Sequence, residues 1–218
     1  MPQDPVPIAV FLSGSGSNCE ALMAAISAGH VLGAVAVAVS DKKGAFGLER
    51  AARRGVPTLV VSPKGHSDRA SHERAILEAI APYEPRLAVL AGYMRLVTPV
   101  LLGHFYSDGR LGVLNVHPAD TRAYQGTHGY EFAMGLAPGS PERLTETRIT
   151  VHYVDEGMDT GPILAQVAVP VHPDDTLENL RARGLAVEHQ ILPRVVDEVV
   201  RGRVRLEGRE LVRTRERA

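Results

Sequence analysis

The sequence predicts an α/β protein, built on an open, mostly parallel twisted sheet with helices on both faces and antiparallel additions in the C-terminal half. In the first half of the chain, apolar runs rich in branched residues alternate with segments of helical period. The runs are continuously apolar, so both faces of each strand are expected to be buried, as in a parallel sheet covered by helices. Hydrophobic residues make up 44% of the 218 residues, which is enough to fill such a core.

The first half supplies the parallel part of the sheet. Expected strands cover residues 8–12, 31–40, 58–61, 87–91 and 111–116. Expected helices cover residues 19–28, 45–54 and 69–81, each between two of these strands. A strand, a helix and a further strand in this order are typical of parallel neighbours joined by a crossover.

The composition changes after His117. The segment 118–147 is rich in Gly, Pro, Thr and charged residues, with only a short helical pattern at 130–136. The sequence then predicts two strands, a long helix that Asp175 or Thr176 can cap, and a small hairpin around a glycine. These cover residues 148–154 and 163–171, 176–201, and 204–212 around Gly208.

Charge and cysteine content exclude several classes of protein. The formal net charge is -1, so the chain lacks the basic excess of nucleic-acid-binding proteins. The single cysteine, Cys19, excludes an internal disulfide and a multi-cysteine zinc cluster, and it suits a reducing compartment. The apolar run near the N-terminus is only about six residues long, too short for a signal peptide or a membrane span. We therefore expect a cytoplasmic protein with no nucleic-acid or membrane partner.

A glycine-rich loop, SGSGSN at residues 13–18, follows the first strand and opens the first helix. Such a loop can be a tight turn with a Ser/Asn helix cap, a dinucleotide site or a phosphate site, because helix N-termini present N–H groups to anions. Cys19 stands where a dinucleotide fingerprint has its third Gly or Ala, although Asp41 keeps that hypothesis open. The loop lacks the lysine of a nucleoside-triphosphate loop. A phosphate monoester is the simplest ligand, with Ser17 and Asn18 as added donors.

Asn115 and His117 end the fifth expected strand. Side chains two residues apart on a strand point to the same side, and ligands of open α/β sheets bind beyond the carboxyl ends of strands. An amide and an imidazole that converge can stabilise a carbonyl oxygen as it gains negative charge. The alternative is a histidine that only satisfies a loop carbonyl.

Asp159 lies in the turn of the segment MDTGPI, between two expected strands. One interpretation is a local acceptor for backbone N–H groups. In the other, its carboxylate raises the pKa of His117, orients the ring and helps to remove a proton. Asp155 and Glu156 are rivals for that role.

Five motifs in order resemble the glycinamide ribonucleotide formyltransferase family. They are SGSGSN at 13–18, LAGYMRL at 90–96, NVHP at 115–118, VHYVDEGMDTGPIL at 151–164 and VEHQILP at 187–193, with FGLERA at 46–51 in addition. The resemblance runs from about residue 8 to about residue 200. It implies a Rossmann-like formyltransferase fold in one domain, 1–218, with a phosphate-binding half at 1–110 and a catalytic and folate-binding half at 111–218.

The resemblance also implies roles for individual residues. The catalytic trio is Asn115, His117 and Asp159. The substrate-phosphate loop is Gly16, Ser17 and Asn18, and Glu188 contacts the glycinamide part. The folate cleft is formed by Tyr93, Met94, Arg95, Leu96 and Val151, with His152 as a weaker candidate and Arg69 near the glutamate tail.

The reaction implied by the resemblance moves the formyl group of 10-formyltetrahydrofolate to the amine of glycinamide ribonucleotide in de novo purine biosynthesis. The Asn/His pair stabilises the oxyanion and the Asp supports it. No metal and no covalent nucleophile is expected, and the enzyme is expected to be a monomer or a homodimer.

The sequence departs from the family after His117. Residues 119–122, ADTR, replace a pattern close to Ser-Leu-Leu-Pro, the segment 135–147 is longer than usual, and Arg148 stands where a small residue is expected. Extra anion contacts by Arg122 or Arg148 are therefore one hypothesis. The altered loop leaves open a formyltetrahydrofolate hydrolase or a sugar-nucleotide formyltransferase. Outside this family, a nicotinamide-dependent oxidoreductase or a non-catalytic folate- or nucleotide-binding module remains an alternative.

Overall fold

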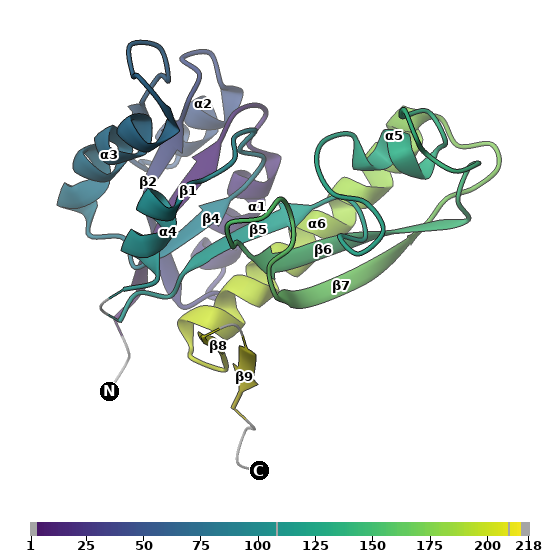
Figure 1. Ribbon diagram of the computed structural model, residues 1–218. Helices are drawn as coiled ribbons and strands as arrows, with labels where there is room; N and C mark the ends of the chain where they lie inside the picture. The colour runs from purple at the N-terminus through teal and green to yellow at the C-terminus, as the bar shows by residue number, and fades with distance from the viewer. Residues whose placement is uncertain (1–3, 108, 209, 215–218) are drawn as a thin grey trace.

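The computed structural model describes residues 4–107, 109–208 and 210–214, and its main feature is a sheet of seven strands (Figure 1). The strand order is β3-β2-β1-β4-β5-β6-β7. Strands β1 to β5 pair in parallel, and β6 and β7 are added antiparallel beside β5. The bounds are β1 Val6–Leu12, β2 Gly33–Ser40, β3 Thr58–Val60, β4 Leu87–Leu90, β5 Val113–His117, β6 Glu146–Tyr153 and β7 Ile163–Pro170. The predicted fold class is confirmed.

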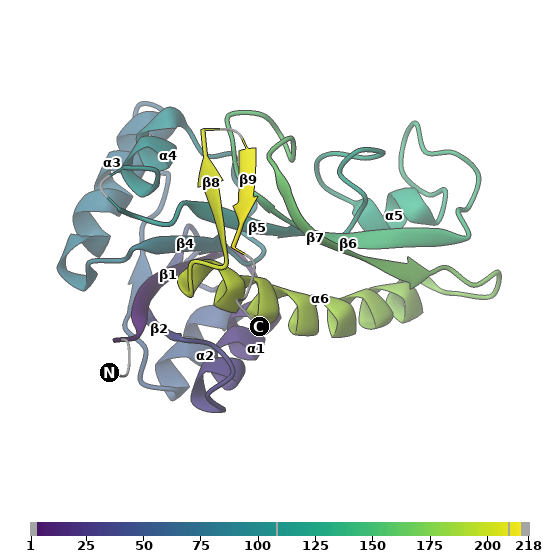
Figure 2. The same cartoon turned by 90° about the horizontal axis from the view of Figure 1, so that it is seen from below.

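Helices cover both faces of the sheet (Figure 2). Their bounds are α1 Ser17–Ser27, α2 Phe46–Arg53, α3 Arg69–Ile80, the 3-10 turn η1 Ala81–Tyr83, α4 Pro99–Phe105, α5 Gly129–Ala133 and α6 Leu177–Val200. The expected hairpin follows as β8 Val204–Glu207 and β9 Glu210–Arg213, and residue 209 within it lies outside the described residues. Within the described ranges, no helix combines the length and the apolar character needed to cross a membrane.

Strand β1 divides the core into two parts. Ile8, Val10 and Leu12 belong to a cluster that includes buried residues of α1, α2 and α6. Ala9 and Phe11 belong to a second cluster, with buried residues of α3 and α4. Figure 2 shows α1, α2 and α6 on one side of the sheet and α3 and α4 on the other. Successive strand residues point to opposite faces, so burial on both faces requires the continuous apolar run that the sequence carries.

Helix α4 does not appear among the sequence-based expectations. It has only seven residues, too few for a clear helical period. Its N-terminal N–H groups are satisfied by two side chains that precede it. Thr98 accepts from Val100 N at 3.2 Å, and Glu73 of α3 accepts from Leu101 N at 3.0 Å. Part of its cap thus comes from another helix, which local sequence does not reveal.

The pairing of β5 with β6 assembles polar side chains around the end of β5. In the antiparallel register, Asn115 lies opposite His152 and His117 lies opposite Thr150. Directly opposite residues share one face of a sheet, so Asn115, His117 and His152 project to the same side. The loop 154–162 between β6 and β7 returns across that face, because Asp159 within it contacts Asn115.

Helix α2 begins directly against the glycine-rich loop. Gly47 N donates to Gly14 O at 3.0 Å. A Cβ on Gly47 would lie 2.8 Å from Gly16 Cα and 2.8 Å from Leu12 Cδ2, closer than real Cβ atoms approach. Gly16 itself has φ +68, in the left-handed region that favours glycine. The two glycines therefore allow the loop and α2 to touch backbone to backbone.

We expect Gly47→Ala to lower the free energy of unfolding by about 1–3 kcal/mol, because the added methyl overpacks this contact. Gly44→Ala is the matched control, since a Cβ there meets no atom within 4 Å. We expect its effect to stay within about 0.5 kcal/mol. Urea unfolding of the three proteins measures both changes. Equal effects of the two substitutions would contradict the close approach.

Candidate active site

A cleft of about 360 Å³ opens between the ends of β4 and β5 and the loop 154–162. One part of its wall is apolar: Met94, Leu96 and Met158 are 63%, 46% and 44% exposed there. The other part carries Asn115, His117, His152 and Asp159. Large exposed apolar side chains beside a cluster of polar groups are typical of a site for a small, partly apolar ligand.

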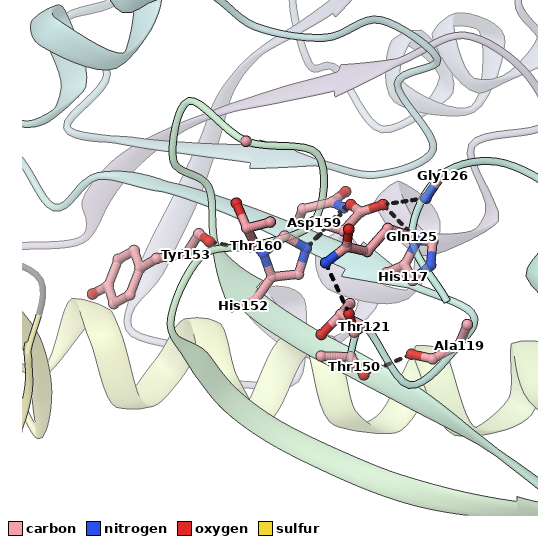
Figure 3. A network of polar contacts seen from close by, with 12 residues as sticks. His117, Ala119, Thr121, Gln125, Gly126, Thr150, His152, Tyr153, Asp159 and Thr160 are labelled. Atoms are coloured by element: carbon pink, nitrogen blue, oxygen red, sulfur yellow. Dashed lines mark hydrogen bonds and ion pairs between the residues drawn. The ribbon is translucent and has the colours of Figure 1, made fainter. Parts of the chain in front are cut away.

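Asp159 lies at the centre of the polar groups (Figure 3). Its Oδ1 accepts from Asn115 Nδ2 at 3.3 Å, and its Oδ2 accepts from Gly126 N at 2.8 Å. His117 Nδ1 is 3.6 Å from Oδ2, and His152 Nε2 is 3.5 Å from Oδ1. One carboxylate thus joins β5, β6 and the loop that follows β5.

The backbone of Asp159 adopts φ +53, a left-handed conformation that Asp tolerates better than most residues. Burial tends to raise the pKa of Asp159, but the contacts with His152, His117 and the Gly126 N–H outweigh it and hold that pKa below its ordinary value. Asp155 takes the local role instead, accepting from Gly157 N at 3.1 Å and Thr160 Oγ1 at 2.6 Å. Of the acids in this loop, Asp159 is the one that reaches both Asn115 and His117.

His117 is 5% exposed, and its Nε2 atom is buried without a hydrogen-bond partner. Burial lowers the pKa of His117, and His152 adds to this, while Asp159 and a hydrogen bond with the Tyr124 backbone oppose it. The net lowering favours a neutral ring at pH 7. With Nδ1–H turned toward Asp159, Nε2 carries the lone pair of the neutral ring and has no partner within the protein.

Asn115 and His152 form a second contact in the same cluster. His152 Nδ1 lies 2.7 Å from the Tyr153 carbonyl oxygen, which only accepts, so Nδ1 carries the proton in the neutral ring. His152 Nε2 then accepts from Asn115 Nδ2 at 3.1 Å. Both N–H groups of the Asn115 amide are therefore directed at protein atoms, one at His152 and one at Asp159. A substrate oxygen must displace one of these contacts to receive an N–H from Asn115.

The glycine-rich loop forms the N-terminus of α1. Gly16 is the N-cap residue, and Ser17 and Asn18 open the helix without a side-chain cap bond. The interpretation as a Ser/Asn cap is therefore wrong, and the side chain of Asn18 instead donates to Glu188 Oε2 at 2.6 Å. Arg50 of α2 reaches back to the Ser15 carbonyl at 3.1 Å. Arg50 therefore places a positive charge beside the loop. This residue is given no role in the sequence analysis.

Asp41, at the end of β2, is engaged within the protein. Ser13 Oγ donates to Asp41 at 2.7 Å and accepts from Met94 N at 3.0 Å, and Arg95 lies 4.0 Å from the other carboxylate oxygen. The dinucleotide hypothesis thereby loses the acid that would bind a ribose. Ser13 and Asp41 instead fasten the segment 92–97, which lines the cleft, to the glycine-rich loop.

The residues predicted for the cleft do not all line it. Tyr93, Met94, Arg95 and Leu96 do, and so does His152. Val151 is fully buried in the core, because it pairs with Val116 and points away from the face that carries Asn115. Arg69 is exposed at the start of α3 and is not among the lining residues. Gly126, to which the sequence analysis gives no role in the site, contributes its N–H to Asp159.

The segment 119–122, which departs from the family pattern, is held by side chains of β6 and β7. Arg148 Nε lies 3.7 Å from Asp120 Oδ2, and Gln166 Nε2 donates to Asp120 Oδ1 at 3.0 Å. Thr150 Oγ1 donates to the Ala119 carbonyl at 2.7 Å. Asp120 and Arg148, two of the departures from the family pattern, thus pair with each other. Within the described ranges, no group of three or more His, Cys, Asp or Glu side chains is arranged to hold a metal ion.

Comparisons with known proteins agree with this geometry. The family described as formyl transferase matches residues 6–196. Phosphoribosylglycinamide formyltransferase of Bacillus subtilis (strain 168) is 38% identical over 194 residues, 88% of this chain and 93% of that protein. A trifunctional purine biosynthetic protein of Bos taurus is 34% identical over 199 residues, 91% of this chain and 19% of that protein. The crystal structure of glycinamide ribonucleotide transformylase 1 from Symbiobacterium toebii is 38% identical, with a TM-score of 0.87 over 96% of this chain and 94% of that one.

We expect the imidazole of His117 to titrate below pH 6.5, its ordinary pKa. Asp159→Asn should lower the pKa of His117 further, because it removes the negative charge that favours the protonated ring. Ring ¹⁵N NMR of the unliganded protein against pH measures both values, with His117→Gln to assign the signal.

Asp155→Asn is the matched control, since it removes a carboxylate of the same loop that is bonded to Gly157 and Thr160. We expect it to leave the midpoint of His117 nearly unchanged. A midpoint above 6.5 in the unsubstituted protein, or a rise in Asp159→Asn, would be incompatible with the burial and the pairing described above.

Proposed function

This chain belongs to the formyl transferase family, and we propose that it transfers the formyl group of 10-formyltetrahydrofolate to the amine of glycinamide ribonucleotide in purine biosynthesis. One observation carries the proposal. Asp159 holds His117 and Asn115 at a cleft that has an apolar wall. The segment that forms this wall is hydrogen-bonded to the glycine-rich loop. The names of the relatives support the same donor group and the same acceptor.

The acceptor is proposed to bind at the N-terminus of α1. The N–H groups of Gly16, Ser17 and Asn18 suit the phosphate of a ribonucleotide, because they combine a left-handed glycine turn with the positive end of an 11-residue helix. Glu188, held by Asn18, suits the amine-bearing end of the glycinamide. These two contacts would lay the acceptor along α1 and α6.

The donor is proposed to bind in the cleft beside Tyr93, Met94, Arg95 and Leu96. These residues fit a pterin ring, since Met94 and Leu96 offer exposed apolar surface and the backbone of this segment offers polar groups. A contact of Arg69 with a glutamate tail stays a prediction. Val151 would act from behind the wall, as a support for His152, rather than by contact with the ring.

In the proposed reaction, the amine of the acceptor attacks the formyl carbon, and negative charge develops on the formyl oxygen. Asn115 would donate an N–H to that oxygen by releasing His152. His117 Nε2 would accept the amine proton in its neutral form and then, as an imidazolium, stabilise the oxyanion. Asp159, which stays ionised, would stabilise that imidazolium and hold its Nδ1–H. The tetrahedral intermediate would then collapse: the bond between the formyl carbon and N10 of the folate breaks, and the proton on His117 Nε2 passes to N10. Tetrahydrofolate and the formylated acceptor would then leave. Positioning both reactants in register would supply much of the rate.

The enzyme is proposed to work as a monomer or homodimer in the cytoplasm, without a metal. The lining residues described above supply proton transfer, oxyanion stabilisation and binding groups, which are the functions this reaction needs.

We expect release of the folate product from 10-formyl-5,8-dideazafolate to depend on glycinamide ribonucleotide, because the amine completes the transfer. Asp159→Asn should lower kcat/KM by a factor of about 10² to 10⁴, since the imidazolium loses its counter-charge. Absorbance of the released folate product gives the rate directly.

Asp174→Asn is the control for loss of a carboxylate, as it lies exposed in the loop before α6. Folate release without the ribonucleotide would identify a hydrolase and refute the proposal. Release with a sugar-nucleotide amine in place of the ribonucleotide would refute the proposed acceptor.

A further inference from the structure

Gly184 lies inside α6, where glycine is among the least favourable residues. Its position is explained by a neighbour. A Cβ on Gly184 would lie 2.5 Å from Tyr130 Cε1 and 2.6 Å from Tyr130 Cζ, closer than real Cβ atoms approach. The missing side chain therefore makes room for the ring of Tyr130, which comes from α5 and is buried.

The ring that Gly184 admits ends at a carboxylate. Tyr130 Oη donates to Glu188 Oε1 at 2.6 Å, and Asn18 Nδ2 donates to Glu188 Oε2 at 2.6 Å. Glu188 lies one turn after Gly184 on α6 and is only 5% exposed. Each oxygen of this buried carboxylate therefore has its own donor, one from α5 and one from α1.

The same three helices connect the two ends of the proposed acceptor site. Asn18 belongs to the glycine-rich loop at the start of α1. Helix α5 begins against the strand end that carries His117, because a Cβ on Gly129 would lie 2.5 Å from the Pro118 carbonyl oxygen. Glu188 is therefore hydrogen-bonded on one side to the glycine-rich loop and on the other to the helix that begins beside the strand end of His117.

The charged and titratable groups around Glu188 come from the helices packed against it. Burial raises the pKa of Glu188, and the hydrogen bonds from Tyr130 and Asn18 and the nearby His189 oppose that rise. Burial and Glu188 raise the pKa of Tyr130, against a smaller opposing effect of Arg181, so its hydroxyl stays a donor. Asn18, from α1, is neutral. The hydrogen bond from Tyr130 lowers the pKa of Glu188 more than the hydrogen bond from Asn18 does, and so favours the ionised carboxylate more strongly.

We propose that Tyr130, seated in the space left by Gly184, is a positioning residue that keeps Glu188 ionised and oriented to accept the amine-bearing end of the acceptor substrate. The identity of that substrate rests on the proposed function. The dependence of Glu188 on Tyr130 does not, since it follows from the contact itself.

Loss of the Tyr130 hydroxyl has a definite chemical consequence. Glu188 would keep one donor instead of two and would hold a proton up to a higher pH. A protonated carboxyl has one oxygen that donates, so it accepts an N–H less well than a carboxylate does. Acceptor binding should therefore weaken most at low pH and recover as the pH rises and Glu188 ionises.

The first test is independent of activity. The carboxyl ¹³C signal of Glu188 is titrated in the unsubstituted protein and in Tyr130→Phe, with Glu188→Gln to assign it. We expect the pKa of Glu188 to be higher in Tyr130→Phe. An unchanged or lower pKa would overturn the proposal.

The second test is kinetic. In Tyr130→Phe we expect KM for glycinamide ribonucleotide to rise by up to about ten-fold, most at the lowest pH tested, and to approach the unsubstituted value as the pH rises, with kcat changed by less than about two-fold. A purely structural role would raise KM equally at each pH. An equal rise, or no rise at all, would overturn the positioning role.

Matched variants separate positioning from loss of stability. Tyr106→Phe removes a hydroxyl that donates to the Val154 carbonyl at 2.7 Å and has no contact with Glu188, so it should not give the pH-dependent KM. Gly184→Ala should displace the ring and reproduce the KM pattern of Tyr130→Phe, whereas Gly103→Ala, in α4 with no atom within 4 Å of its Cβ, should not. Thermal unfolding confirms that each variant is folded.

Failure of the proposed function gives a different result. If the unsubstituted protein does not use glycinamide ribonucleotide at all, the proposed function falls, and the ¹³C titration still decides whether Tyr130 controls Glu188. If that titration shows the higher pKa while KM stays unchanged at every pH, Tyr130 does not position Glu188 for the substrate.

Discussion

The placement of one ionised carboxylate, Asp159, governs the arrangement of this site. A carboxylate that is partly removed from water needs hydrogen bonds, and here they come from Asn115 on β5 and from the Gly126 N–H. These groups meet because β6 pairs antiparallel with β5, so that the loop 154–162 can return over β5. The left-handed backbone of Asp159 is part of that return. Strain of this kind persists only where the surroundings fix it, as the local bonds of Asp155 do here.

Hydrogen bonds connect the cleft, the glycine-rich loop and α6 to one another. Ser13 and Asp41 fasten the segment that lines the apolar cleft to the glycine-rich loop. Asn18 and Glu188 fasten that loop to α6, and Tyr130 joins α6 to the region of His117. The cleft and the glycine-rich loop are therefore held at a fixed separation before any ligand binds. Group transfer between two bound molecules benefits most from this kind of preorganisation.

Much of this could be predicted from the sequence, because the signals are local. Continuous apolar runs predicted the parallel strands, and the spacing of Asn115 and His117 predicted that they share one face. Helix α4 was missed because it is short and is capped partly by Glu73 from α3. The choice between Val151 and His152 as a wall residue needed the register of β6 against β5, which places His152 opposite Asn115. The roles of Tyr130 and Gly184 depend on a contact between distant segments, and a sequence pattern alone does not show it.

The most direct test of the central role of Asp159 is a double-mutant cycle in kcat/KM with His117→Gln, Asp159→Asn and the double variant. If Asp159 acts through His117, the double variant should be little worse than the more damaged single variant, with a coupling energy of about 2 kcal/mol or more. If instead the two losses multiply, with a coupling energy near zero, the two residues act independently, and the arrangement of the site around Asp159 does not explain the reaction.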